Sequence, residues 1–337
     1  AASQSLRQRL SSDRLVIAFV AEFSRGKSEL INAIFFADAG RRVLPATPGR
    51  TTMCPVELSW DARELPTLDL LPIDTRGESA SLAEWRAQRE RWQRHSLDPS
   101  DAEGLARALE QVTATRLVRV DDARRLGLWS DSSPIDNPPL QPDGRVEVPA
   151  WRHAVINYPH PLLRRGLVVV DTPGLNAIGA EPELTLSLLP TAHAAVFLLA
   201  ADTGVTRSDL GVWRDHLGDR GCERFVVLNK IDMLADPLLL PEQVQAQVQR
   251  QRDDAAATLG IDVERVFALS ARQALTARMH GDEAGLAETS ARVKRAGAAA
   301  VTVCGDVSQS AAIQRVLTLL ERYPSNAQML VDLPSKS

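Results

Sequence analysis

The sequence has few cysteines, no excess of basic residues and no long apolar run. Its three cysteines, Cys54, Cys222 and Cys304, stand far apart and form no C-x-x-C pair, so neither a zinc site nor a disulfide framework is predicted. The net charge of −4 gives no electrostatic reason to expect a nucleic-acid partner. No apolar stretch is long enough to span a bilayer, and the first ten residues contain no apolar signal core. These absences predict a cytoplasmic, globular protein.

The two ends of the sequence carry weaker signals than its middle. The chain begins with Ala1 and not with Met, and we expect it to be a piece of a longer protein. Residues 1–13 place Leu6 and Leu10 one helical turn apart, which predicts an N-terminal helical stub.

What the sequence does contain is a phosphate-binding signature near its start. Leu15–Val20 is a short apolar run typical of a buried strand, and Lys27–Phe36 repeats apolar residues at helical spacing. The turn between them ends in Gly26-Lys27-Ser28, so strand, turn and helix together match the context of a Walker A loop. The usual first glycine of that loop is replaced by Ala21.

The residue types of this loop suit phosphate chemistry. Gly26 lets the backbone approach an anion, and the following helix points its positive end toward it. Lys27 would reach the β- and γ-phosphates, and Ser28 would offer its hydroxyl to Mg²⁺. The alternative is a Gly-Lys-Ser turn that merely opens a helix.

A loop rich in proline, glycine and threonine follows this helix. It spans Ala39–Thr52, the place where a nucleotide-sensing switch lies in a P-loop fold, and a threonine hydroxyl there can complete the Mg²⁺ shell. A plain surface loop is the alternative.

A second phosphate-side motif follows a later strand. The apolar run Leu167–Val170 leads directly into Asp171-Thr172-Pro173-Gly174, which is a Walker B arrangement. Asp171 would hold Mg²⁺ through water, and the Gly174 N–H would meet the γ-phosphate.

A third motif predicts which base is bound. Asn229-Lys230-x-Asp232 follows another apolar strand. The Asp232 carboxylate can accept two hydrogen bonds from guanine, whereas adenine would leave it unpaired, at a cost of about 1–3 kcal/mol. The Lys230 stem would cover one face of the base, and the N–H of Ala271 would donate to guanine O6.

The order of strands and helices predicts an α/β fold with a mostly parallel central sheet and helices on both faces. Residues 81–128 have a mostly helical pattern, with Trp85 and Trp92 on one face, and the proline-rich stretch Ser130–Pro149 is predicted as a loop. The other predicted strands are Pro55–Trp60, Thr67–Leu71, His153–Tyr158, Ala195–Ala200, Phe225–Leu228 and Arg265–Leu269, and the other predicted helices are Glu183–Leu189, Arg207–Leu217 and Gln243–Leu259.

With these motifs in order, the chain resembles the dynamin superfamily of GTPases, and the bacterial dynamin-like proteins in particular. The resemblance rests on AEFSRGKSELINAIF, LPATPGRTTMCPVEL, VVVDTPGLNAIG, FLLAADTGVTRSDL, VVLNKID and ALSAR. Two finer features support it: Thr52-x-x-Pro55 after the switch loop, and a long insertion over about 61–150 between the two switches.

The resemblance implies a set of site residues. Thr52 is the switch threonine, with Thr51 as the alternative, and Leu175 stands where other GTPases keep a water-positioning glutamine. The resemblance passes that role to Ser24, aided by a monovalent cation (K⁺ or Na⁺), and leaves Arg25 as a hypothetical arginine finger. The implied catalytic residues are Ser24, Lys27 and Thr52; the Mg²⁺ ligands are Ser28, Thr52 and Asp171; and the GTP/GDP-binding residues are Glu22, Phe23, Ser24, Arg25, Gly26, Lys27, Ser28, Asp171, Gly174, Asn229, Lys230, Asp232, Ser270, Ala271 and Arg272.

The resemblance also implies an organisation and a function. Residues 14–280 are expected to form the GTPase domain, and 281–337 a helical segment at the base of a bundle, with Ser308–Arg322 as an amphipathic helix. We expect GTP hydrolysis that is stimulated by homodimerisation through the GTPase domains and is linked to membrane remodelling in the full-length protein. We expect no nucleic-acid partner, and membrane contact only through regions outside this chain, at the inner face of a membrane. The alternatives are a nucleotide-dependent scaffold with little hydrolysis and a ribosome- or RNA-linked GTPase.

Overall fold

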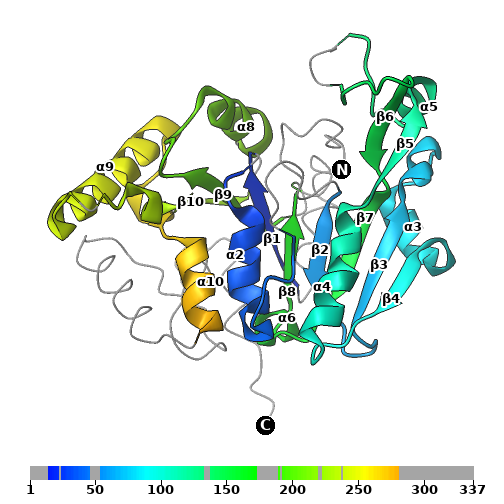
Figure 1. Cartoon of the computed structure of the whole chain (residues 1–337), viewed down its shortest axis with the longest axis horizontal. Helices are drawn as coiled ribbons and strands as arrows, with labels where there is room; N and C mark the ends of the chain where they lie inside the picture. The colour runs from blue at the N-terminus through cyan, green and yellow to red at the C-terminus, as the bar shows by residue number, and fades with distance from the viewer. Residues whose placement is uncertain are drawn as a thin grey trace.

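A single large sheet organises the computed structural model, which describes residues 14–22, 24–45, 54–132, 137–172, 189, 192–218, 222–236 and 238–280. Within these residues the sheet has nine strands in the order β11-β10-β9-β1-β8-β2-β7-β3-β4, and Figure 1 shows it running across the whole molecule. The chain is therefore an α/β protein, as its sequence predicts.

One half of the sheet is entirely parallel. β9 lies at its centre, and its strands are mostly apolar because both faces of the sheet are covered. The strands of this half are β11 (Val266–Ala268), β10 (Glu223–Asn229), β9 (Ala194–Ala200), β1 (Leu15–Ala21) and β8 (Leu167–Asp171).

The other half of the sheet is mixed. β2 (Val56–Ser59) runs antiparallel to β8 and parallel to β7 (Trp151–Asn157). β3 (Thr67–Pro72) is antiparallel to β7, and β4 (Gln93–Ser96) forms the edge. Because β3 and β4 come from the insertion, this segment extends the central sheet instead of folding apart from it.

Helices cover both faces of the sheet. On one face lie α2 (Lys27–Ile31), α10 (Ala271–Met279) and α4 (Ala102–Glu110), and on the other α8 (Arg207–Leu217) and α9 (Pro241–Leu259). Two buried apolar clusters, one under each set of helices, form the core. Helix α2 continues into a π-helical turn, Asn32–Phe36, and the short α6 (Pro161–Arg164) precedes β8.

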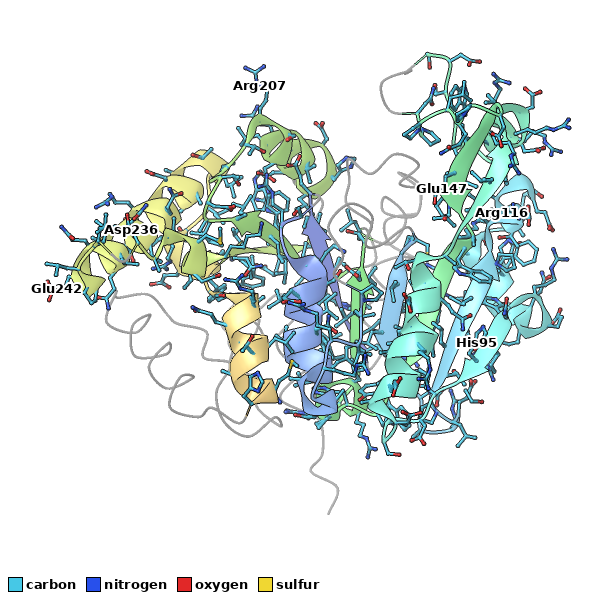
Figure 2. The ribbon with its side chains drawn as sticks, viewed as in Figure 1. His95, Arg116, Glu147, Arg207, Asp236 and Glu242 are labelled. Carbon is cyan, nitrogen blue, oxygen red and sulfur yellow. The ribbon has the colours of Figure 1, made fainter. Side chains whose placement is uncertain are left out.

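A small unit of the insertion has its own core. β5 (Thr115–Arg119) and β6 (Arg145–Pro149) form an antiparallel pair, and α5 (Val120–Arg125) packs against them. Figure 2 shows Arg116 and Glu147 in this unit, at the opposite end of the molecule from Asp236 and Glu242 near the start of α9.

The predicted strands are confirmed, with end points that differ by a few residues, and so are the helices that correspond to α2, α8 and α9. The prediction of a mostly helical stretch over 81–128 is wrong in part. It contains α3 (Leu82–Ala87) and α4, but also the strands β4 and β5. β4 (QRHS) is polar and largely exposed, and β5 (TRLVR) has only two adjacent apolar residues, so both lack the apolar run that marks a buried strand.

Two further predictions in the insertion need correction. Trp85 and Trp92 do not share a helical face, because α3 ends at Ala87. They nevertheless pack together as buried residues, and the Trp92 Nε1–H donates to the Trp85 carbonyl at 2.8 Å.

Ser130–Pro149 is not a loop throughout, since its last five residues form β6. The predicted stub 1–13, the helix 183–189 apart from Leu189, and the segment 281–337 lie outside the described residues.

Candidate nucleotide-binding site

The sequence motifs meet at one edge of the sheet. β1, β8, β9, β10 and β11 are parallel neighbours, so their carboxyl ends lie side by side. The predicted Walker A loop, residues 21–28 and called the phosphate-binding loop below, follows β1. The Asp171 motif ends β8, and the Asn229 motif ends β10. This is the edge at which open α/β sheets bind their ligands.

The phosphate-binding loop has the backbone of a strained turn. Ser24 adopts a left-handed conformation with φ of 62°, which is uncommon for a residue with a Cβ. Gly26 has φ of 86°, and a Cβ on it would lie 2.3 Å from Asn229 Nδ2, so a larger residue is excluded there. Ala21 replaces the first loop glycine without strain because it is the last residue of β1, paired with Leu198 of β9.

Lys27 and Asp171 form a buried ion pair between the first two motifs. The Lys27 ammonium donates to Asp171 Oδ1, and both side chains are less than a tenth exposed. Burial raises the pKa of the Asp171 carboxyl above its ordinary value, and Lys27 partly offsets the rise. The pair therefore joins the end of β8 to the start of α2, where the phosphates of a nucleotide would lie.

The oxygen donors of this region fit Mg²⁺. Ser28 is the second residue of α2, one residue from Lys27, and offers a hydroxyl oxygen, while Asp171 offers a carboxylate; both are hard ligands of the type Mg²⁺ prefers. Among the described residues no group of three or more His, Cys, Asp or Glu side chains could hold a metal ion. A Mg²⁺ ion here would thus depend on phosphate and water oxygens as well, which is its usual mode of binding beside nucleotides.

Asn229 connects the base-binding motif to the phosphate-binding loop. It is 2% exposed. Its Nδ2 donates to the Arg25 carbonyl at 2.9 Å, and its Oδ1 accepts from the Ala271 N–H at 2.9 Å. The segments that follow β1 and β11 are therefore both fixed to one side chain at the end of β10.

The predicted base-reading carboxylate lies beside this junction. Asp232 sits in the 3₁₀ turn Ile231–Leu234, which begins after Lys230 in the left-handed conformation, with φ of 62°. Its carboxylate is 6% exposed and accepts from Arg272 Nη2 at 2.7 Å. Arg272 thus holds the Asp232 carboxylate in a fixed position beside the junction.

The residues after β11 serve the local fold as well. Ser270 is the N-cap of α10, and its hydroxyl accepts from the Gln273 N–H at 3.1 Å. The Ala271 N–H, predicted to donate to guanine O6, donates to Asn229 in this structure. A guanine oxygen would have to share or replace that acceptor, so this role of Ala271 stays a prediction.

Arg25 contacts Glu22 in its own segment and residues from a different part of the chain. Its Nη2 contacts Asp209 Oδ2 at 2.7 Å and Glu22 Oε2 at 3.0 Å, and its Nη1 donates to Thr203 Oγ1 at 2.5 Å. The guanidinium is buried. This arrangement ties the loop to α8 and to the turn before it, and it differs from the free guanidinium that an arginine finger requires.

Thr203 and Asp209 lie beside the loop although the sequence does not predict them as its neighbours. Thr206 and Asp209 form a capping box at the start of α8, and their T-x-x-D spacing could have predicted that cap. Their contact with Arg25 spans more than 180 residues, so no local pattern contains it.

Some predicted site residues lie outside the described part of the chain. These are Phe23, both candidate switch threonines (Thr51 and Thr52), Gly174 and Leu175. Their roles remain predictions.

Comparison with known proteins agrees with the motifs. The sequence model of the dynamin family matches residues 17–231, which is more than half of the chain. The bacterial dynamin-like protein of Nostoc punctiforme is 32% identical over 165 residues, covering 45% of this chain and 24% of the relative. The probable chloroplastic transmembrane GTPase FZO-like of Arabidopsis thaliana is 32% identical over 123 residues, covering 36% of this chain and 13% of the relative.

Among solved structures, the chain is similar to an oligomerised bacterial dynamin pair. The match covers 98% of this chain and 47% of the solved chain, with 14% sequence identity and a TM-score of 0.45. The matched region is thus about a quarter or less of the curated relatives' length and about half of this solved chain. No helix among the described residues is long and apolar enough to cross a membrane.

Proposed function

This chain belongs to the dynamin family and carries its GTPase domain, and from this premise we propose that it binds GTP with Mg²⁺ and hydrolyses it. The observation that carries the proposal is the convergence of the Lys27–Asp171 pair and the Asn229 junction at the carboxyl edge of the parallel strands. One end of that edge carries phosphate-binding groups and the other carries a carboxylate suited to guanine.

The bound nucleotide replaces contacts that the protein makes with itself. The β- and γ-phosphates take the place of Asp171 as the partner of Lys27, because the loop and the start of α2 direct N–H groups and a positive dipole toward the same position. Ser28 and Asp171, with the switch threonine Thr52, would hold the Mg²⁺ ion, which would neutralise charge on the phosphates.

Hydrolysis itself needs positioning and charge stabilisation more than covalent chemistry. Water attacks the γ-phosphorus, the bond to the bridging oxygen breaks, and negative charge on the leaving phosphate is met by Lys27 and the loop N–H groups. Ser24, exposed in a strained conformation at the middle of the loop, is the residue we propose to orient the water. We propose that a monovalent cation, K⁺ or Na⁺, assists Ser24 in this step.

Specificity for guanine comes from Asp232. Its carboxylate, which Arg272 holds in place, accepts from the guanine N1–H and amino group. Lys230 and the segment of Ser270 and Ala271 enclose the base.

Two GTPase domains are proposed to associate across the nucleotide face and to stimulate each other. In the full-length protein we propose that this activity drives work at the inner face of a membrane, with the membrane contacts lying outside residues 14–280. Residues 281–337 are proposed as the base of a helical bundle.

GTP turnover measured against protein concentration, in K⁺ and in Na⁺, tests this function. We expect phosphate release whose rate per protein molecule rises with concentration, because a partner domain completes the site. Lys27→Ala is the control: it removes the phosphate-binding charge and should lower turnover by at least about 100-fold. A rate per molecule that is flat with concentration would contradict stimulation by association. Nucleotide binding without phosphate release in either cation would identify a scaffold instead.

A further inference from the structure

The buried ion pair between the phosphate-binding loop and helix α8 has a role that the motifs alone do not assign. We propose that Arg25 is a positioning residue: its ion pair with Asp209 holds the phosphate-binding loop in the conformation that binds and hydrolyses GTP. The proposal rests on the proposed GTPase function, and it gives a role in that function to Asp209, which lies outside the recognised motifs.

The contacts of the guanidinium leave no room for a direct catalytic role in this arrangement. Nη2 is shared between the carboxylates of Asp209 and Glu22, and Nη1 donates to the hydroxyl of Thr203. Reaching a phosphate would require Arg25 to leave two buried carboxylates without their counter-charge, which is unfavourable in a low-dielectric site.

The backbone of Arg25 is held from the opposite side. Asn229 Nδ2 donates to the Arg25 carbonyl, and Asn229 Nδ2 would collide with any side chain at Gly26. Arg25 therefore links the base-binding motif, through its carbonyl, to α8, through its guanidinium.

The loop needs such support because it is strained. Ser24, directly before Arg25, is in the left-handed conformation, which costs about 1–2 kcal/mol for a residue with a Cβ and persists only where surrounding contacts fix it. Loop N–H groups must point inward together to bind phosphate, so a loop that relaxes at Ser24 loses both affinity and rate.

Asp209 is well placed to act as the fixed end of this connection. It is fully buried, and its Oδ2 also accepts from the Thr206 N–H at 3.0 Å and from the Thr206 hydroxyl at 2.8 Å in the capping box of α8. By contrast, Figure 2 shows Arg207, in the first turn of the same helix, pointing away from the molecule. The buried carboxylate of Asp209, and not the exposed guanidinium of Arg207, is thus the charge at the start of α8 that contacts the loop.

Two single variants and their combination test the connection. Asp209→Asn keeps an oxygen for the helix cap but removes the charge that holds Arg25, and Arg25→Gln removes the other partner. Each should raise KM and lower kcat, with kcat/KM reduced about 10- to 100-fold, and the double variant should be no worse than either single variant. Arg25→Lys should recover part of the loss because it keeps the charge toward Asp209.

Amide hydrogen exchange of the segment 21–29 supplies a readout that does not depend on GTP. Asp209→Asn and Arg25→Gln should speed exchange there. Two controls should leave exchange and kinetics unchanged: Arg207→Gln, which removes an exposed arginine from the same helix end, and Asp69→Asn, which removes a buried carboxylate paired with Arg94 at the far side of the sheet.

The outcomes separate the alternatives. If Arg25→Gln loses turnover while Asp209→Asn keeps normal kinetics and loop exchange, Arg25 acts directly on the substrate and the positioning role is overturned. If neither variant changes loop exchange, it is overturned as well. If the wild-type protein fails to bind guanine nucleotides, the proposed function fails, and the exchange measurement still decides whether Arg25 and Asp209 hold the loop.

Discussion

At the scale of single residues, the functional edge of this protein depends on buried polar side chains whose partners lie far away in the sequence. Lys27 and Asp171 are 144 residues apart, and Asn229 and Arg25 are 204 apart. The sequence predicts the residue types, because phosphate, Mg²⁺ and guanine each demand particular groups. It does not predict that Arg25 faces α8, because nothing in a Gly-Lys-Ser loop specifies what lies behind it.

His153 makes stability depend on pH at the residue scale. It is fully buried in β7, its ring packs edge-on against Trp92, and within the described part of the chain neither ring nitrogen has a hydrogen-bond partner. Burial, together with the nearby Arg86 and Arg152, lowers its pKa from 6.5 to about 3.

The unfolded chain therefore binds a proton at His153 that the folded protein rejects. This proton does not affect the free energy of unfolding above pH 6.5. As the pH falls from 6.5 toward 3, protonation of His153 in the unfolded chain lowers the free energy of unfolding. We expect His153→Phe to reduce the loss of unfolding free energy over this window, measured by denaturant titration at several pH values. His280→Phe, at an exposed position, is the control. An identical pH dependence in wild type and His153→Phe would show that this histidine is not buried in its neutral form.

At the scale of elements, α2 and the segment after it illustrate what local pattern can and cannot predict. Apolar spacing predicts a helix over Lys27–Phe36, and the structure has α2 followed by a π-helical turn there. The turn contains Asn32, a fully buried polar residue whose Oδ1 accepts from the N–H groups of Val43 and Leu44 and whose Nδ2 donates to the Leu44 carbonyl. Periodicity cannot reveal such a contact, because its partner lies beyond the helix.

Asn32 anchors the chain where it enters the switch loop. Asn32→Ala would leave two buried N–H groups and a carbonyl without partners, and we expect it to lower the unfolding free energy by about 2 kcal/mol and to speed amide exchange at Val43 and Leu44. Arg42→Gln, which removes a half-exposed partner of Glu29 in the same segment, should have little effect on either measurement. Equal effects of the two variants would argue against a specific anchor at Asn32.

The strands show the same division between local and distant information. Apolar runs predict the strands of the parallel half because both of their faces are covered. β4 and β5 escape prediction because they are short strands in which most residues are polar or charged. β4 lies at the sheet edge and β5 in the separate pair. Their pairing depends on partners elsewhere in the fold.

At the scale of the whole molecule, five parallel strands bring the three motifs to one edge. The motif order in the sequence predicts the parallel α/β half and the place of the site, since ligands bind at the carboxyl ends of such strands. It does not predict that the insertion would add β3 and β4 to the same sheet and give β5 and β6 a core of their own.

The central claim is that this edge reads guanine, and the nucleotide preference of Asp232→Asn tests it most directly. The amide of asparagine cannot accept from guanine as a carboxylate does, but it can donate to the extra oxygen of xanthine. We expect the variant to lose GTP affinity by about 10- to 100-fold or more and to gain affinity for xanthosine triphosphate, measured by competition against a fluorescent nucleotide. Unchanged GTP affinity in Asp232→Asn would contradict the assignment of the base site.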